Sequence, residues 1–170
     1  MMNLPEPISS VEGSPVQRRF AVLIAPKTDR ELEGMAGESR RLTLWHFGRT
    51  IRMFAPLYLS NECINSCKYC GFARENPIQR VTLDVEQMVR EARHLKLEGF
   101  RNILLVAGEH PKFVSSGYLE QCVASLRPEF PAISLEVGPM ETADYVPIVK
   151  AGAEGLVVYQ ETYHRETYEE

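Results

Sequence analysis

The 170-residue sequence has no long hydrophobic run and no dense cluster of one charge. No apolar stretch reaches the roughly 18 residues that a membrane-spanning helix needs, and Met1 to Ser14 lack the basic and apolar segments of a secretory signal. The formal net charge of -4 gives no reason to expect a nucleic-acid partner. These absences predict a cytoplasmic protein whose partners include neither a membrane nor a nucleic acid.

Cysteine is also scarce, because the chain has only four. Three of them, Cys63, Cys67 and Cys70, follow one another with the spacing C-x3-C-x2-C. In a reducing compartment such clustering indicates metal binding rather than disulfides. The fourth, Cys122, falls on the apolar face of a predicted helix and is interpreted as a small buried hydrophobe.

The chain divides into three predicted parts. Residues 1–30 are rich in Pro, Ser and Glu and are predicted to be a poorly ordered arm, and residues 31–50 are predicted to be a leading helix. From residue 51 onward, strands alternate with helices, which predicts an α/β fold with a parallel sheet. The predicted strands are 51–59, 102–107, 133–137 and 155–159; the predicted helices follow the N-cap Asp84, surround residues 119–126, and span 145–151 with Pro147 in the first turn.

The cysteine loop follows directly on the first predicted strand, at the end where α/β barrels collect their chemistry. Three thiolates on one short loop can bind three irons of a [4Fe–4S] cluster and leave the fourth iron open for a ligand. A structural zinc would need a fourth protein ligand, for which His110 or His164 is the candidate. The spacing favours the cluster, and zinc stays as an alternative.

Polar residues also follow the second strand and interrupt the third. Gly108 and Glu109 come after the second strand, where a glycine permits close approach of the backbone to a ligand. Glu136 alternates with Leu135 and Val137, so its side chain should point away from the helices and into the barrel. A carboxylate buried there needs a partner, and the ammonium group of a ligand would supply one.

The fourth strand runs into two tyrosines, a glutamate and a histidine within residues 159–164. This density is unusual for a solvated turn. We expect Glu161 to contact a cofactor or substrate, and Tyr163 and His164 to form walls of the pocket.

The motif C-x3-C-x-aromatic-C, with Tyr69 in the aromatic position, resembles the signature of the radical S-adenosylmethionine (SAM) superfamily. The resemblance implies a [4Fe–4S] cluster on the three cysteines, SAM bound at its open iron, and Tyr69 beside the adenine. One electron from the cluster would then cleave SAM to methionine and a 5′-deoxyadenosyl radical. Gly108 and Glu109 match the family's "GGE-like" motif, which holds the SAM ammonium, although Ala107 replaces its first glycine.

Three segments, residues 54–61, 105–110 and 158–164, are together similar to the tyrosine lyases of thiamine biosynthesis, the 2-iminoacetate synthases. The resemblance covers about residues 31–170. It implies that the radical takes a hydrogen from the amino group of L-tyrosine, and that Cα–Cβ cleavage then releases p-cresol and 2-iminoacetate (dehydroglycine). It also implies reduced flavodoxin or ferredoxin as electron donor and thiazole synthase as partner.

A complete (β/α) barrel takes about 250 residues, so four strands predict the N-terminal part of a radical SAM barrel. Its remaining part is expected either on a complementing C-terminal polypeptide or in a portion of the protein that this sequence does not include. The first hypothesis is a tyrosine lyase or a sister lyase of the hydrogenase-maturation (HydG) or tryptophan (NosL) type. The second is a non-catalytic cluster-binding remnant, which would release no 5′-deoxyadenosine. The third is a zinc protein, which would be colourless.

Overall fold

The computed structural model describes residues 13–169 and divides the chain into two compact units, residues 1–51 and 52–170. In the second unit a parallel sheet has the strand order β1-β2-β3-β4, so each strand lies next to its sequence neighbour. This confirms the predicted α/β fold. The strands are β1 (Phe54–Ser60), β2 (Asn102–Ala107), β3 (Ala132–Glu136) and β4 (Gly155–Leu156); the helices are α3 (Val85–Leu97), α4 (Ser116–Leu126), α5 (Thr142–Ala151) and α6 (Arg165–Glu169).

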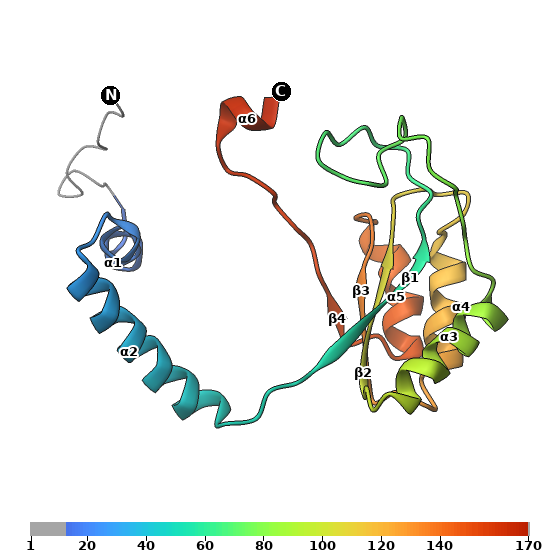
Figure 1. Cartoon of the computed structure of the whole chain (residues 1–170), viewed down its shortest axis with the longest axis horizontal. Coiled ribbons are helices and arrows are strands. Elements are labelled where there is room, and N and C mark those ends of the chain that lie inside the picture. Colours follow the sequence, from blue (N-terminus) through green and yellow to red (C-terminus); the bar gives the residue numbers. More distant parts are fainter. Residues whose placement is uncertain (1–12, 170) are drawn as a thin grey trace. The chain divides into compact units, whose positions relative to one another are not determined.

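Helices α3, α4 and α5 cover one face of the sheet (Figure 1). Alternate strand residues point into this layer, where Leu57, Leu105 and Leu135 are buried among apolar helix residues such as Met88 and Leu119. Cys122 belongs to the same core with no exposed surface, which confirms its interpretation as a buried hydrophobe. Burial raises the pKa of its thiol to about 11. The side chains of the strand residues between these buried positions lie on the opposite face of the sheet.

Local signals explain where α3 begins and ends. The Asp84 side chain accepts a hydrogen bond from the Gln87 backbone N–H at 2.7 Å, and the Gln87 side chain accepts one from the Asp84 N–H at 2.9 Å. This is the predicted capping box. Gly99 follows the helix with φ of +99°, a conformation that favours glycine.

Several predicted boundaries in the second unit are wrong: β1 begins at Phe54 rather than at residue 51, and β3 is shifted by one residue. Helix α5 begins at Thr142 rather than Tyr145, so Pro147 lies inside the helix and not in its first turn. The earlier start is supported by the Tyr145 hydroxyl, which accepts a hydrogen bond from the Met140 N–H just before the helix. Strand β4 ends at Leu156 rather than at residue 159, and its last ladder partner is Leu135 of β3.

The first unit contains two helices, α1 (Pro15–Ile24) and α2 (Asp29–Phe47). Helix α2 corresponds to the predicted leading helix, but α1 lies within the segment predicted to be poorly ordered. A capping box between Ser14 and Gln17, followed by proline at the first helical position, accounts for α1. Residues 1–12 of the predicted arm lie outside the described residues. Among residues 13–169, no helix is both long and apolar enough to cross a membrane.

Candidate functional site

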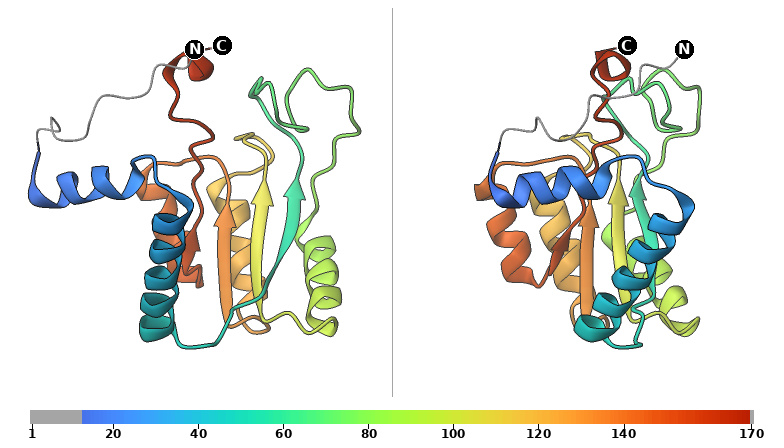
Figure 2. Two further views of the ribbon diagram at one scale, coloured as in Figure 1. Left: turned by 60° about the vertical axis from the view of Figure 1, so that its left-hand side comes forward. Right: turned by 90° about the vertical axis from the view of Figure 1, so that its left-hand side faces the viewer.

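The carboxyl ends of β1, β2 and β3 point to one edge of the sheet, where the loop with the three cysteines also lies (Figure 2). This cysteine loop, residues 61–80, leaves β1 and returns beside it. The Leu83 N–H donates to the Leu59 carbonyl at 2.8 Å, and the side-chain oxygen of Asn61 accepts from the Val81 N–H at 2.7 Å. Both ends of the loop are therefore fixed to the end of β1.

Within the loop, Cys63 and Cys70 are half-buried and Cys67 is exposed. The Phe72 N–H donates to the Cys70 sulfur at 3.4 Å. The Asn76 side chain donates to the carbonyls of Cys70 and Gly71, each at 3.1 Å. Because the Gly71 carbonyl and the Phe72 N–H belong to one peptide group, Asn76 helps to orient the donor that reaches the sulfur.

Gly108 lies directly against the start of the cysteine loop. Its N–H donates to the Ser60 carbonyl at 3.0 Å. A Cβ added at Gly108 would collide with the Glu62 carbonyl oxygen and lie 3.1 Å from Cys63 Cβ. The sequence predicted a close approach between this glycine and a ligand, and the structure shows a close approach to the backbone that carries the first cysteine.

Glu109 joins the end of β2 to the same loop. Its carboxylate accepts a hydrogen bond from the Asn65 side chain at 2.7 Å, and its carbonyl accepts one from the Ile64 N–H at 2.9 Å. Its side chain also packs over Gly138, where an added Cβ would lie 2.6 Å from Glu109 Cγ. These contacts make Glu109 a support for the loop.

A cavity of about 490 Å³ opens at this edge of the sheet. Because Leu135 is buried against the helices, Glu136 faces the opposite side and lines this cavity, as the alternation predicted. The cavity brings together six of the eight residues predicted to bind the cluster or the cofactor: Cys63, Tyr69, Cys70, Gly108, Glu136 and Glu161. The other two predicted residues, Cys67 and Glu109, do not line it. Cys67 instead lines a neighbouring cavity of about 670 Å³, which shares Tyr69 and Glu161 with the first.

Tyr69 and Glu161 both line the two cavities. The pKa of the Tyr69 phenol is raised above its usual value, first by desolvation and then by the neighbouring Glu161 carboxylate. The protonated phenol can act as a hydrogen-bond donor. Both side chains are largely exposed, so they lie within reach of a ligand from solvent.

The structure does not bring Tyr163 and His164 to either cavity. The Tyr163 side chain is 90% exposed. His164 lies at the start of α6, where its Nδ1 is 2.8 Å from the Thr167 hydroxyl oxygen. Tyr159 and Tyr168 occupy cavity walls in their place. The alternation of the sequence could not reveal this, because the chain leaves the sheet after β4.

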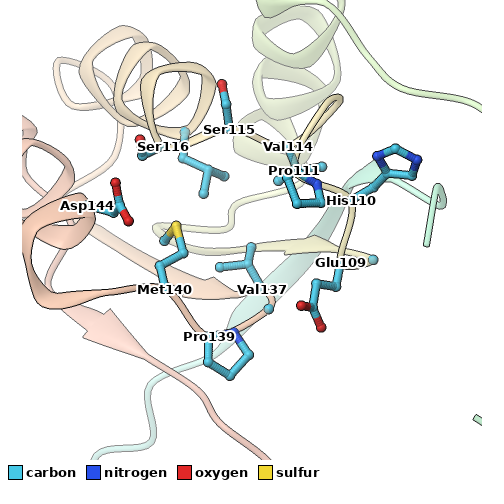
Figure 3. Close-up of a pocket in the computed structure, with 13 residues that line it drawn as sticks. Glu109, His110, Pro111, Val114, Ser115, Ser116, Val137, Pro139, Met140 and Asp144 are labelled. Carbon is cyan, nitrogen blue, oxygen red and sulfur yellow. The ribbon is translucent and has the colours of Figure 1, made fainter. Parts of the chain in front are cut away.

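A further cavity of about 340 Å³ lies on the helix side of the same edge (Figure 3). It is bordered by the loop after β2, by Ser115 and Ser116 at the start of α4, and by Asp144 of α5. In Figure 3 the Glu109 carboxylate points away from the two serines. His110, considered as a zinc ligand, borders this cavity, and its buried Nδ1 has no hydrogen-bond partner among the described residues.

Comparisons with known proteins agree with this geometry. The chain is 41% identical over 146 residues to 2-iminoacetate synthase of Escherichia coli (strain K12), a match that covers 86% of this chain and 39% of that protein. The crystal structure of HydG, a maturase of the [FeFe]-hydrogenase, superposes with a TM-score of 0.83 at 30% identity over 89% of this chain and 35% of HydG. The chain is a homologue of radical SAM enzymes.

A second radical SAM structure, methylornithine synthase (PylB), matches with a TM-score of 0.72 at 25% identity and covers 95% of this chain and 48% of PylB. The four-stranded sheet therefore corresponds to part of a radical SAM barrel. The chain spans about 39% of the length of the 2-iminoacetate synthases it matches. No protein-family model matches the chain.

Radical SAM homologues use a [4Fe–4S] cluster and SAM, and the cysteine loop fits such a cluster. Each thiolate of a [4Fe–4S] cluster binds a different iron, whereas a zinc ion needs all its ligands at one point. Among residues 13–169, no three Cys, His, Asp or Glu side chains converge on a single ion position. The donor set of the loop is three sulfurs, one of which already accepts an N–H, and such a set can bind three irons of a cluster.

Proposed function

We propose that this chain carries the cluster- and SAM-binding part of a radical SAM lyase that cleaves the Cα–Cβ bond of L-tyrosine to p-cresol and 2-iminoacetate. The observation that carries the proposal is the one cavity that joins Cys63 and Cys70 to the predicted SAM contacts. The 41% identity to 2-iminoacetate synthase supports tyrosine as the substrate.

In this proposal Cys63, Cys67 and Cys70 each hold one iron. When bound, the cluster offers an open iron and one electron to SAM, and the resulting radical chemistry belongs to these cofactors rather than to the protein. The protein supplies binding and orientation. Three sulfurs would leave one iron of the cluster without a protein ligand, and the cavity beside Cys63 and Cys70 could admit a ligand from solvent.

The polar residues of the cavity have separate roles in this proposal. Glu136 pairs with the ammonium group of SAM, which offsets the cost of keeping a carboxylate half-buried. Tyr69 lies beside the adenine, and Glu161 accepts hydrogen bonds from SAM or the substrate. Gly108 lets the first cysteine approach β2, and Glu109 holds the loop through Asn65.

The proposed partners are L-tyrosine, reduced flavodoxin or ferredoxin as electron donor, thiazole synthase, and a polypeptide that completes the barrel, all in the cytoplasm. A sister aromatic amino acid lyase is the second candidate. The TM-score of 0.83 with HydG favours it, since that match is the better of the two structural comparisons.

Anaerobic reconstitution of the chain with iron and sulfide tests the proposal. We expect a brown protein with about four irons per chain, and an EPR signal of the reduced cluster that changes when SAM is added. With dithionite, tyrosine and a polypeptide that completes the barrel, 5′-deoxyadenosine and p-cresol should form. A colourless zinc protein would overturn the cluster assignment. A cluster that releases 5′-deoxyadenosine but no p-cresol would favour a sister lyase of the tryptophan (NosL) type, because a lyase of the HydG type would also release p-cresol from tyrosine.

A further inference from the structure

The centre of the cysteine loop is filled by a guanidinium group rather than by an apolar side chain. Arg80 Nη1 donates to the carbonyls of Asn61 at 2.6 Å and Phe72 at 2.9 Å, and Arg80 Nη2 donates to the carbonyl of Ala73 at 2.7 Å. Two longer bonds from Nη2 reach carbonyls further along the loop. One side chain therefore joins the start of the loop to its far end through main-chain atoms alone.

The charge of this guanidinium is not neutralised by a carboxylate. Arg80 is half-buried, and no ion pair among residues 13–169 includes it. Carbonyl oxygens satisfy its N–H donors, which reduces the cost of burial but leaves the positive charge in place. Arg74 in the same loop is different, because its exposed guanidinium pairs with Glu75 at 3.0 Å.

The carbonyls that Arg80 holds lie close in sequence to the cluster thiolates. Asn61 precedes Cys63 by two residues, and Phe72 follows Cys70 by two residues. Phe72 also carries the N–H that donates to the Cys70 sulfur. Holding Asn61 and Phe72 together therefore limits how far the first and third sulfurs can separate.

We propose that Arg80 is a positioning residue for the iron–sulfur cluster. It closes the loop so that the three sulfurs face one cluster, and its unpaired charge offsets part of the negative charge of the thiolates. A nearby positive charge favours the reduced cluster, since reduction adds one negative charge. This role rests on the proposed function, because it presupposes that the loop binds a cluster.

The closure of the loop can be tested in the cluster-free chain by amide hydrogen exchange. Arg80→Gln should accelerate exchange at the loop amides of Ile64, Ala73 and Arg74 by about tenfold or more, because their hydrogen bonds are within or next to the closed loop. Amides of β2 should keep their wild-type rates. Arg74→Gln is the matched control: it removes the same charge from the same loop, but the lost bonds go only to the side chains of Ser66 and Glu75, so the loop amides should be unchanged. Wild-type exchange in Arg80→Gln would overturn the proposal.

The action of Arg80 on the cluster can be tested in the anaerobically reconstituted chain. Arg80→Gln should release iron to a chelator about tenfold faster than the wild type, in line with the loss of a partner that orients a metal ligand. Its reduction potential should be more negative than that of Arg74→Gln. A redox titration followed by EPR measures this shift, which a purely structural role would not produce.

Arg80→Lys keeps the charge but loses the planar fork of donors. In this variant the loop amides should exchange hydrogen faster than in the wild type, while the reduction potential of the cluster stays near the wild-type value. The same variant replaces Arg80→Gln if Arg80→Gln does not fold. If the wild type loads normally and Arg80→Gln matches it in iron release and potential, this inference alone is overturned. A wild type that takes up no iron would overturn the proposed function as well.

Discussion

The cysteine loop, residues 61–80, and the segment after β4, residues 157–164, lie at the same edge of the sheet but are held by different means. The loop bonds to the end of β1 and to Glu109 after β2. The later segment bonds to the sheet through the Val157 N–H, and its remaining hydrogen bonds are local, as between Gln160 and Thr162. The iron-binding side of the site is thus organised before any ligand arrives, whereas Glu161 is carried by a segment with little support.

The largest expected effect comes from removing a sulfur from the organised region. Cys67→Ala should abolish stable [4Fe–4S] assembly, because two thiolates cannot hold the cluster. Iron analysis should fall from about four per chain to nearly none. Cys122→Ala is the control, since that thiol lies in the core away from the loop and its loss should leave the iron content unchanged. Normal iron in Cys67→Ala would count against the assignment.

A smaller but still large effect is expected at the contact between β2 and the loop. Gly108→Ala places a methyl group against the Glu62 carbonyl and should displace Cys63, which lowers cluster occupancy and destabilises the fold by about 1–3 kcal/mol. Iron content and urea unfolding measure the two effects. Gly117→Ala, where an added Cβ meets nothing within 4 Å, should leave the iron content unchanged and should not destabilise the fold, since alanine favours helix α4. Full occupancy in Gly108→Ala would mean that the loop can adapt.

The weakly held segment should respond in a different way. Glu161→Ala should leave the iron content unchanged and weaken SAM binding by about tenfold, the effect of losing one charged hydrogen bond. A SAM titration followed by EPR measures this. The pKa of Tyr69 should fall, because the Glu161 carboxylate no longer opposes the phenolate, and NMR of labelled tyrosine rings can follow that change. Glu166→Ala on α6 is the control, and unaltered SAM binding in Glu161→Ala would make Glu161 a surface residue.

The smallest effect is expected at an ion pair outside both regions. Hydrogen bonds from Arg93 and then Lys96 hold the pKa of Glu129 below its usual 4.5. The ion pairs of Glu129 therefore stabilise the fold fully at pH values above the unfolded-state pKa of 4.5, and this stabilisation is lost as the pH falls through the lower folded-state pKa. Glu129→Gln should therefore lower the Tm slightly at pH 7 and not at low pH, and salt should shrink the difference. Glu120→Gln is the control, and equal effects of the two changes would contradict the pairing.

The sequence predicted those parts of the fold in which one local pattern dominates. Strand β2 has the predicted bounds, because its apolar run has no competing turn signal. The direction of Glu136 followed from its burial-prone neighbours. Helix α1 was not predicted, because the Pro- and Ser-rich composition of the segment indicates disorder although it contains the capping box between Ser14 and Gln17.

The sequence predicted the side chains that carry the chemistry of the site. It did not predict the residues that hold the cysteine loop in place, because those residues act on main-chain atoms. The acceptors of Arg80 are carbonyl groups, which every residue possesses and which leave no pattern in a sequence. Likewise, the neighbour that requires Gly108 is the Glu62 carbonyl, 46 residues earlier in the chain. Only the folded backbone brings these groups together.

The order of the strands in the sheet has an evolutionary consequence. Strands β1 to β4 lie side by side in the order of the chain. The loops that follow β1, β2 and β3 therefore line different parts of the cavities at the carboxyl ends of the strands. An insertion or a substitution in one loop can therefore change one part of the cavity lining while the other loops keep their positions. Such modular variation suits a scaffold whose relatives bear names as different as 2-iminoacetate synthase and methylornithine synthase.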